Sequence, residues 1–433
     1  MAAIRLTYIG GGSTRAPGTV AAIVLRGAAF SGSEVTLVDL DERRLDVVRR
    51  IALAMARARG VDLRVTTTTD RAAGLRDADV VLTSFRPGGF AARVLDETIP
   101  LRHGVIGQET QGPGGFFMAL RSIAVMREIV ADMERLCPNA VLINYTNPVN
   151  IVSEAVTHHS LIPAISLCEG PITFPPGAVR NAGLDPVQLD ATLVGLNHTG
   201  WTVRHEYGGE DLFGLIRAAA ERRRREPSGD VRSDRMLHLA AAMDSLPSAY
   251  LYYYYFRDEA LAEARSTPTT RAQDILAEVA GYWRHYEEQA ASAAPELDPA
   301  RSRGGILELE LAIDVIDAIV NDTGGTWPVN VPNRGGALPG FPDDLVVEVP
   351  ATVDRRGAHP VAVPPLPRHV RGLIEMLGEY QALTAEAAWS GGRREAVRAL
   401  ASNPLVLSLS VAERLYDELA AAHRAYLPDR LLA

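Results

Sequence analysis

Apolar and polar residues alternate along the first part of the chain in a way that predicts strands and helices in turn. Short runs rich in Val, Ile and Leu predict buried strands, whereas longer stretches with helical spacing of apolar residues predict helices. The expected strands are residues 4–9, 34–39, 65–68, 78–84, 140–145 and 164–167, and the expected helices are residues 20–25, 41–59, 118–135 and 149–158. This alternation indicates an α/β protein with a parallel sheet covered on both faces.

The pattern changes near residue 170, so we divide the chain into residues 1–170 and residues 171–433. The second part is expected to be mixed and rich in helices. Two paired strands are expected at 192–196 and 200–206, a loop and strand at 335–349, and mostly helical segments at 212–285, 304–321 and 370–422.

Composition narrows the chemistry that this chain can perform. All 44 basic residues are arginine, which excludes lysine Schiff bases, lysine general bases and the lysine of a P-loop. Two cysteines, Cys137 and Cys168, are too few for a disulfide framework or an all-thiolate metal site. The formal net charge of -9 argues against nucleic-acid binding. We therefore interpret the arginine run at 222–225 as a solvated helix face.

Sequence features that would direct the chain to a membrane or out of the cell are not found. Apolar stretches are shorter than a membrane span requires. The first residues lack the pattern of a signal peptide and begin a strand almost at once. Since the low cysteine content agrees with a reducing compartment, we expect a cytoplasmic protein with no membrane partner.

A glycine-rich loop after the first strand predicts a dinucleotide site. Gly10 and Gly12 have the spacing of a Rossmann-like phosphate loop, although Arg15 takes the place of its third glycine. Asp39, 27 residues after Gly12, ends the second strand, where a carboxylate suits the ribose of NAD and would repel the 2′-phosphate of NADP. The alternative is that these glycines only form a tight turn between strand and helix and bind no dinucleotide. The residues assigned to the cofactor are Gly10, Gly12, Ser13, Thr14, Asp39 and Arg86.

Other polar stretches also follow expected strands, where open α/β sheets bind ligands. Each one alone could be a turn or a helix cap, but their recurrence at successive strand ends indicates a site. Cys168 and His198 could together bind one divalent ion, with Zn²⁺ or Ni²⁺ favoured over Mn²⁺ by softness, or could simply be buried. Five tyrosines between residues 250 and 255 suit helix packing. One of them could act as a base if cationic neighbours lowered its pKa.

Longer motifs connect these residues to a known family. The chain contains YIGGGS, GQETQGPGG, INYTNP, LCEGP, GLNHTGW, PSAYLYYYY and TTRA. With these motifs it resembles the NAD- and metal-dependent family 4 glycoside hydrolases, especially their 6-phospho-β-glucosidase branch. The resemblance implies a Rossmann-like doubly wound sheet with a mixed, helix-rich C-terminal part, as in lactate and malate dehydrogenases. It assigns NAD binding to residues 1–170, and substrate, metal and oligomer contacts to residues 171–433.

The resemblance also implies roles for single residues. Cys168 and His198 would hold the metal, usually Mn²⁺, and Tyr250 would be the catalytic base. Arg93, Asn147 and Arg271 would contact the sugar, and Ser13 would help to bind NAD or the sugar phosphate. In the implied mechanism NAD⁺ takes the C3 hydride, the metal stabilises the enediolate, and Tyr250 removes the C2 proton. The C1–O bond then breaks by elimination, water adds, and NADH returns the hydride.

Two positions depart from the family pattern. Glu169 follows the metal cysteine, where the phospho-β branch commonly has Asn, the phospho-α branch Asp, and enzymes for unphosphorylated sugars His. Trp327 stands where many relatives have His. Glu169 is therefore either the acid that protonates the leaving oxygen or a residue that orients the site. These departures leave the anomer preference open.

The leading hypothesis is hydrolysis of 6-phospho-β-glucosides by a cytoplasmic homodimer or homotetramer. Alternatives within the family are 6-phospho-α-glucosides and unphosphorylated or uronic-acid glycosides, as for α-galactosidases, α-glucosidases or α-galacturonidases. More distant alternatives are an NAD-dependent 2-hydroxy acid dehydrogenase and a non-catalytic nucleotide sensor. Without lysine, any phosphate or other anionic group of the sugar must be held by arginine, amides and hydroxyls.

Overall fold

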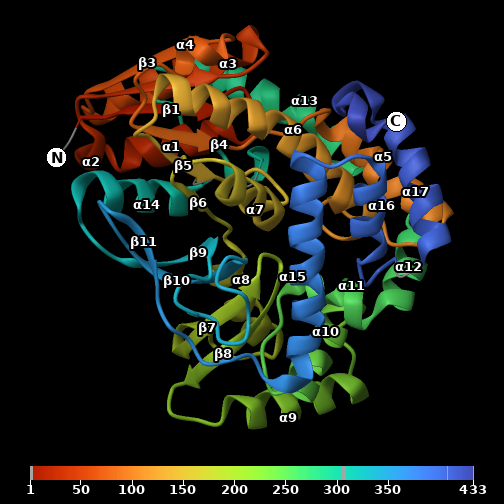
Figure 1. Ribbon diagram of the computed structural model, residues 1–433. Helices are drawn as coiled ribbons and strands as arrows, with labels where there is room; N and C mark the ends of the chain where they lie inside the picture. The colour runs from red at the N-terminus through yellow and green to blue at the C-terminus, as the bar shows by residue number, and fades with distance from the viewer. Residues whose placement is uncertain (1–2, 304–308, 407, 433) are drawn as a thin grey trace.

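A single sheet of eleven strands runs through the described part of the protein (Figure 1). The structure is a computed structural model that describes residues 3–303, 309–406 and 408–432. Along the sheet the strands follow the order β3-β2-β1-β4-β5-β6-β9-β10-β7-β8, and β11 pairs with β10. Both parts of the chain therefore contribute strands to the same sheet. The division at residue 170 remains a prediction about which part binds the cofactor and which binds the substrate.

The first six strands are parallel and lie where the apolar runs predict them. Their order, 3-2-1-4-5-6, is that of doubly wound dinucleotide-binding sheets. Ligands of such sheets bind beyond the carboxyl ends of the strands, at the point where the strand order reverses. That point lies here between β1 and β4. The six strands are β1 (Arg5–Ile9), β2 (Ser33–Val38), β3 (Leu63–Thr68), β4 (Val80–Thr83), β5 (Val141–Asn144) and β6 (Ala164–Ser166).

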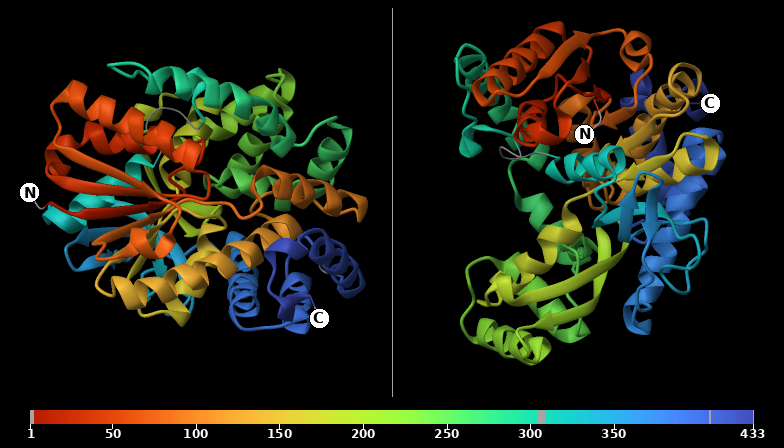
Figure 2. Two further views of the ribbon diagram at one scale, coloured as in Figure 1. Left: turned by 90° about the horizontal axis from the view of Figure 1, so that it is seen from above. Right: turned by 90° about the vertical axis from the view of Figure 1, so that its left-hand side faces the viewer.

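Helices cover both faces of the parallel strands (Figure 2). On one side α1 packs against α3 and α14, and on the other α6 packs against α4, α7 and α15. Because α14 and α15 come from the second part of the chain, the core of the first part is closed by later residues. The helices of the first part are α1 (Ala16–Leu25), α2 (Gly27–Phe30), α3 (Glu42–Arg59), α4 (Arg71–Leu75), α5 (Gly89–Arg102), α6 (Gly112–Leu136) and α7 (Val149–His159).

Helix α5 is not predicted by the sequence pattern, and the composition of its buried side explains why. Arg93, Asp96 and Glu97 are all buried on this helix, so charged residues occupy positions that usually reveal a helix by apolar spacing. Pro100 also lies inside it. The helix begins directly after Gly88, whose φ of +80° is readily adopted by glycine.

The remaining strands are antiparallel. The expected hairpin of β7 (Leu189–Leu196) and β8 (Thr199–Tyr207) is confirmed. Strand β9 (Thr326–Pro332) is not expected, because Pro328 and Pro332 cannot donate hydrogen bonds and usually argue against an interior strand. It pairs along its length with β10 (Val346–Asp354) but meets β6 at only one described residue pair, so few donors are required on that side. Strand β11 (Gly357–Pro360) is also additional.

The helical segments expected in the second part are largely confirmed. The arginine run ends α9 and is mostly exposed, as expected. Residues 304–308 of one expected helix lie outside the described residues. In the described ranges no helix is long and apolar enough to cross a membrane. The helices are α8 (Gly170–Asn181), α9 (Leu212–Arg225), α10 (Val231–Met243), α11 (Tyr252–Tyr255), α12 (Arg257–Ser266), α13 (Arg271–Ala290), α14 (Glu310–Asn321), α15 (Arg368–Trp389), α16 (Arg393–Ala401) and α17 (Leu409–Ala422).

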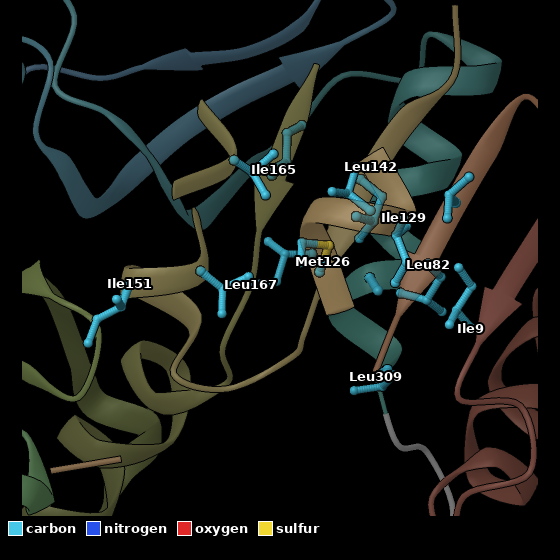
Figure 3. Packing of buried hydrophobic residues seen from close by; sticks show 14 of the residues in the cluster. Ile9, Leu82, Met126, Ile129, Leu142, Ile151, Ile165, Leu167 and Leu309 are labelled. Carbon is cyan, nitrogen blue, oxygen red and sulfur yellow. The ribbon is translucent and has the colours of Figure 1, made fainter. Parts of the chain in front are cut away.

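One apolar core extends between the sheet and its helices (Figure 3). Side chains from four parallel strands meet α6 there, and Leu309 joins them from the second part of the chain. Burying each aliphatic side chain of this size stabilises the fold by about 1.5–3 kcal/mol. This packing fixes the strands, and with them the loops at their carboxyl ends. The labelled residues of these strands and of α6 are Ile9, Leu82, Leu142, Ile165, Met126 and Ile129.

Candidate functional site

The glycine loop after β1 lies against the end of β4. Gly10 has φ of +103°, and a Cβ added to it would lie 2.1 Å from the backbone oxygen of Ser84. The amide of Gly12 donates to Oδ2 of Asp39 at 2.9 Å, which holds the loop beside the end of β2. The buried Ser13 hydroxyl makes no hydrogen bond within the described residues. A narrow glycine loop with a buried hydroxyl that the described residues leave unpaired, and with a neighbouring carboxylate, fits the phosphates and ribose of a dinucleotide.

Cys168 and His198 lie together at the ends of β6 and β7. Their Sγ and Nε2 atoms are 3.5 Å apart. Ligands of one tetrahedral ion would be about 3.6 Å apart at usual metal–sulfur and metal–nitrogen bond lengths. The described residues hold no group of three His, Cys, Asp or Glu side chains that could bind a metal. The pair therefore fits an ion with open positions that substrate oxygens could fill.

The backbone and a neighbouring hydroxyl orient His198. It occupies the tight turn between β7 and β8 with φ of +68°, which is uncommon for a residue other than glycine and typical of functional turns. Its Nδ1 lies 2.9 Å from Oγ1 of Thr110, which fixes the ring. Burial lowers the pKa of His198 to about 4 and raises the pKa of Cys168 to about 12. The imidazole is therefore ready to bind a metal, whereas the thiol must release a proton to do so.

Tyr250 completes this group. Its ring stacks on that of His198, with centroids 3.9 Å apart and an interplanar angle of 9°. Burial has a larger effect on the pKa of Tyr250 than the charge of Arg93, which acts to lower it, as expected of a cationic neighbour. Burial raises the pKa of Tyr250, the charge of Glu109 adds to this, and Arg93 opposes it. The phenol ring of Tyr250 therefore lies directly beside the pair of Cys168 and His198.

An arginine cluster surrounds Glu109. Both Arg86 and Arg93 form ion pairs with its carboxylate. Burial would raise the pKa of Glu109, but the charges of the two arginines lower it to about 2. Arg93 is also held by Glu97, with 2.6 Å between Nε and Oε1. Arg93 is thus buried and its charge is balanced twice, which makes it a fixed part of the site.

Arg303 is a further member of this cluster that the sequence analysis missed. Its guanidinium lies 5.1 Å from the ring centre of Phe90, and that of Arg86 lies 5.4 Å from the same ring. In the described ranges no carboxylate forms an ion pair with Arg303. Burial and the nearby charge of Arg15 lower its pKa to about 10. The cluster therefore has an excess of positive charge that suits an anionic ligand, although no motif in the sequence marks Arg303.

The other expected site residues differ in their positions. Asn147 follows β5 and is half-buried, and its carbonyl accepts a hydrogen bond from Ser122 at 2.9 Å. Glu169 is half-buried at the start of α8, directly after Cys168. Arg271 is exposed at the start of α13. The next residue, Ala272, donates its amide to Glu97 at 2.8 Å, so the backbone of Arg271 is tied to the arginine cluster.

Comparison with known proteins identifies the family. The profile described as Family 4 glycosyl hydrolase matches residues 5–178, and the profile of its C-terminal domain matches residues 193–406. The chain belongs to family 4 of the glycosyl hydrolases. It is 36% identical to the probable 6-phospho-β-glucosidase of Bacillus subtilis (strain 168), covering 98% of each chain. It is 33% identical to the 6-phospho-β-glucosidase of Escherichia coli (strain K12), covering 98% of this chain and 96% of the relative.

Solved structures agree with this assignment. The 6-phospho-β-glucosidase from Thermotoga maritima, solved with NAD and glucose-6-phosphate, is similar with a TM-score of 0.83 and 26% identity, covering 98% of this family 4 chain and 99% of that chain. A 6-phospho-α-glucosidase from gut microorganisms, solved with NAD and Mn²⁺, has the same TM-score and identity, covering 99% of each chain. A lactate dehydrogenase from Cryptosporidium parvum, at 14% identity, covers 89% of this chain and 99% of that chain with a TM-score of 0.53 and shares the fold. The expected Rossmann-like fold of this family 4 enzyme is therefore confirmed.

Proposed function

We propose that this family 4 enzyme hydrolyses 6-phospho-β-glucosides with NAD⁺ and a divalent metal, most simply Mn²⁺. The observation that carries the proposal is the stacking of Tyr250 on His198, whose Nε2 lies 3.5 Å from Sγ of Cys168. The stacking supports Tyr250 as the base for the C2 proton, because its ring lies against one of the two side chains suited to hold a metal. The printed names of the relatives support the substrate, and the T. maritima structure solved with manganese, NAD⁺ and glucose-6-phosphate supports the cofactors.

Different residues of this chain carry out different steps of the proposed reaction. When bound, NAD⁺ supplies oxidation at C3 and the metal supplies a Lewis acid at the sugar oxygens. Tyr250 removes the proton from C2 and exchanges it with solvent, so a proton derived from water returns to C2 when the step is reversed. Glu169 donates a proton to the leaving oxygen at C1, and Thr110 keeps the ring of His198 in place. Arg93 and Asn147 orient the sugar hydroxyls from positions that the packing makes rigid.

The arginine cluster supports an anionic sugar. Two carboxylates pair with Arg93, and one of them also pairs with Arg86. Among the described residues, Arg303 is therefore the arginine of this cluster whose charge is left for a ligand. Bidentate hydrogen bonding to phosphate is what a guanidinium does well, and this chain has no lysine to share the task. We therefore assign the 6-phosphate to the arginine cluster, and we expect Ser13 and Arg271 to help to bind it.

A second candidate substrate is a 6-phospho-α-glucoside. Relatives with this specificity are also similar, including the maltose-6′-phosphate glucosidase of B. subtilis at 30% identity. Glu169 favours this alternative, because the phospho-α branch also has a carboxylate at this position. The anomer preference thus depends on where the carboxyl group of Glu169 lies relative to the leaving oxygen.

Substrate assays test the proposal directly. With NAD⁺ and Mn²⁺ present, p-nitrophenyl 6-phospho-β-glucoside should be cleaved faster than the 6-phospho-α, unphosphorylated and uronic-acid analogues. No net NADH should accumulate, and the C2 hydrogen of the product should exchange with solvent deuterium. Brisk cleavage of a uronide without turnover of the phosphorylated substrate would refute the proposed substrate. Net NADH formation from a hydroxy acid would indicate a dehydrogenase instead.

We also infer that the enzyme works in the cytoplasm as a homodimer or homotetramer, with the cofactor held by residues 1–170 and with substrate and metal held by residues 171–433 together with residues of the first part, such as Arg93 and Cys168. Light scattering of the purified enzyme measures the oligomeric state. A monomer at micromolar concentration would contradict the expectation.

A further inference from the structure

We infer that Phe174 and Tyr253 form the subsite for the leaving group, and that this subsite favours an aromatic aglycone. Both rings lie beside the ring of Tyr250, Phe174 on α8 and Tyr253 on α11. The inference rests on the proposed function, because the position of the leaving group follows from the roles of Tyr250 and Glu169.

Phe174 is held close to Glu169 by its own helix. It lies one turn along α8, and a Cβ added to Gly170 would lie 2.6 Å from Cε2 of the Phe174 ring. The ring is therefore folded back over Gly170, next to the Cys168–Glu169 backbone. Its edge meets Tyr250, with ring centroids 6.0 Å apart and an interplanar angle of 65°. Phe174 is half-buried, so part of its ring is open to a ligand.

Tyr253 forms the second side. Its ring centroid lies 6.4 Å from that of Tyr250, at an interplanar angle of 44°. The guanidinium of Arg232 lies 5.0 Å from the Tyr253 ring and 4.6 Å from the Tyr252 ring, which supports both rings by cation–π contacts. Tyr253 is also half-buried. The two rings are therefore firmly placed and still accessible in part.

The chemistry of the reaction places the leaving group against these rings. Tyr250 acts on C2, and Glu169 acts on the oxygen attached to the neighbouring C1. One face of the Tyr250 ring is covered by His198, one of the two residues proposed to hold the metal. A substituent on C1 would then extend past Glu169 towards the edges of the Tyr250 ring. Phe174 and Tyr253 lie at these edges. Aromatic rings favour offset or edge contacts with other rings, which suits an aryl aglycone.

The test compares two 6-phospho-β-glucosides that differ only in the leaving group, p-nitrophenyl and methyl. For Phe174→Leu and Tyr253→Leu we expect kcat/KM for the aryl substrate to fall about three- to tenfold relative to that for the methyl substrate. The affinity for glucose-6-phosphate, which has no aglycone, should remain unchanged. Phe256→Leu is the matched control, because Phe256 packs against Tyr252, with 5.6 Å between ring centroids. It should leave the ratio of the two substrates unchanged.

A further variant separates loss of a ligand contact from damage to the fold. Phe174→Tyr retains an aromatic ring and should restore the aryl preference that Phe174→Leu loses, which separates ligand contact from damage to the fold. An equal loss with both substrates, or an unchanged ratio in both leucine variants, would overturn the inference. If the wild-type enzyme cleaves neither phosphorylated substrate, the proposed function fails instead. The aryl and methyl forms of the glycoside that it does cleave then supply the same comparison.

Discussion

The two cysteines show how strongly the surroundings of a residue determine its chemistry. Cys168 lies 3.5 Å from the imidazole of His198, whereas Cys137 is buried at the end of α6, where burial raises its pKa to about 11. Cys168→Ser should therefore weaken Mn²⁺ binding at least about tenfold, as loss of a ligand or its supporting residue typically does. Titration calorimetry measures the affinity.

Cys137→Ser is the matched control for this change. It should affect stability slightly and leave Mn²⁺ affinity within about twofold, since Cys137 is part of the apolar core and is not part of the candidate site. Equal affinities in the two variants and the wild type would show that the metal binds elsewhere.

Tyr250 permits a substitution that removes only its hydroxyl. Tyr250→Phe keeps the ring that stacks on His198, so folding and Mn²⁺ binding should be preserved. Loss of the base should lower kcat by about 10²–10⁴-fold and abolish the exchange of the C2 hydrogen with solvent. Tyr255→Phe is the control, because that ring packs on Trp201, with 5.6 Å between centroids, and should keep its activity within about twofold. Full activity of Tyr250→Phe would exclude its role as the base.

Glu109 gives the stability of the protein a defined acid dependence. Its pKa in the folded state is about 2, below the ordinary value of 4.5, so the unfolded chain binds the proton more readily. Its stabilising contribution is present above pH 4.5 and is lost as the pH falls towards 2. A shift of this size corresponds to about 3 kcal/mol.

The corresponding prediction compares the wild type with Glu109→Gln. At pH 7 the variant should unfold at a lower urea concentration, because Arg86 and Arg93 lose their common carboxylate, a cost of about 3–5 kcal/mol. The difference between the two midpoints should shrink between pH 4.5 and pH 3. A difference that stays constant over this range would show that Glu109 is not ionised in the fold.

Among the elements, α5 is the one on which the candidate site most depends. Two of its buried charged residues, Arg93 and Glu97, belong to the arginine cluster of the candidate site. Asp96 instead accepts two hydrogen bonds from Arg121 of α6, at 3.0 and 2.6 Å, and both side chains are fully buried. Nε2 of His423, just after α17, lies 2.9 Å from the same carboxylate. The residue after the C-terminal helix thereby packs against α5, the helix that carries Arg93.

Removal of this buried carboxylate should be costly. Asp96→Ala leaves Arg121 buried and unpaired, which should lower the free energy of unfolding by about 3–5 kcal/mol and raise KM as α5 shifts. Asp417→Ala is the control, since it breaks a half-exposed pair with Arg393 and should cost less than about 1 kcal/mol. Urea unfolding with substrate kinetics measures both. Equal costs would show that the buried pair contributes no more than the surface pair.

At the scale of the whole molecule, the sheet and core are continuous across the boundary that the sequence suggests. Helix α15 starts in the lower part of Figure 1 and runs upward to pack on α6 and α7 of the parallel half. Leu309 and other later residues complete the same core as Ile9 and Leu82. Fragments 1–170 and 171–433 should therefore not fold separately, although they contribute different parts of the site.

Expression of fragment 1–170 alone tests this expectation. Without α14 and α15 it would expose apolar surface on both faces of its sheet, so we expect aggregation or a broad unfolding transition. The full chain, which keeps the same residues in place, is the control and should unfold cooperatively. A soluble fragment with a sharp transition and NAD affinity equal to that of the full chain would refute it.

The sequence by itself determined the parallel half of the sheet and the identities of most candidate site residues. Strands buried on both faces appear as continuous apolar runs, and loops that hold phosphates or metals require particular residues at fixed spacing. These are local signals, so Gly10, Asp39, Cys168 and His198 could be found without coordinates. Strand β9 and helix α5 could not, because prolines and buried charges conceal their local patterns.

Only the tertiary structure decided how distant residues combine. Arg303 joins Arg86 around Phe90, and Glu109 balances two arginines of the cluster, though no motif links these positions. The exposure of Arg271, the ring of Phe174 over Gly170 and the raised pKa of Tyr250 likewise depend on packing. Burial and charge act through space, and residues far apart in the chain become neighbours only when the sheet and its helices have assembled.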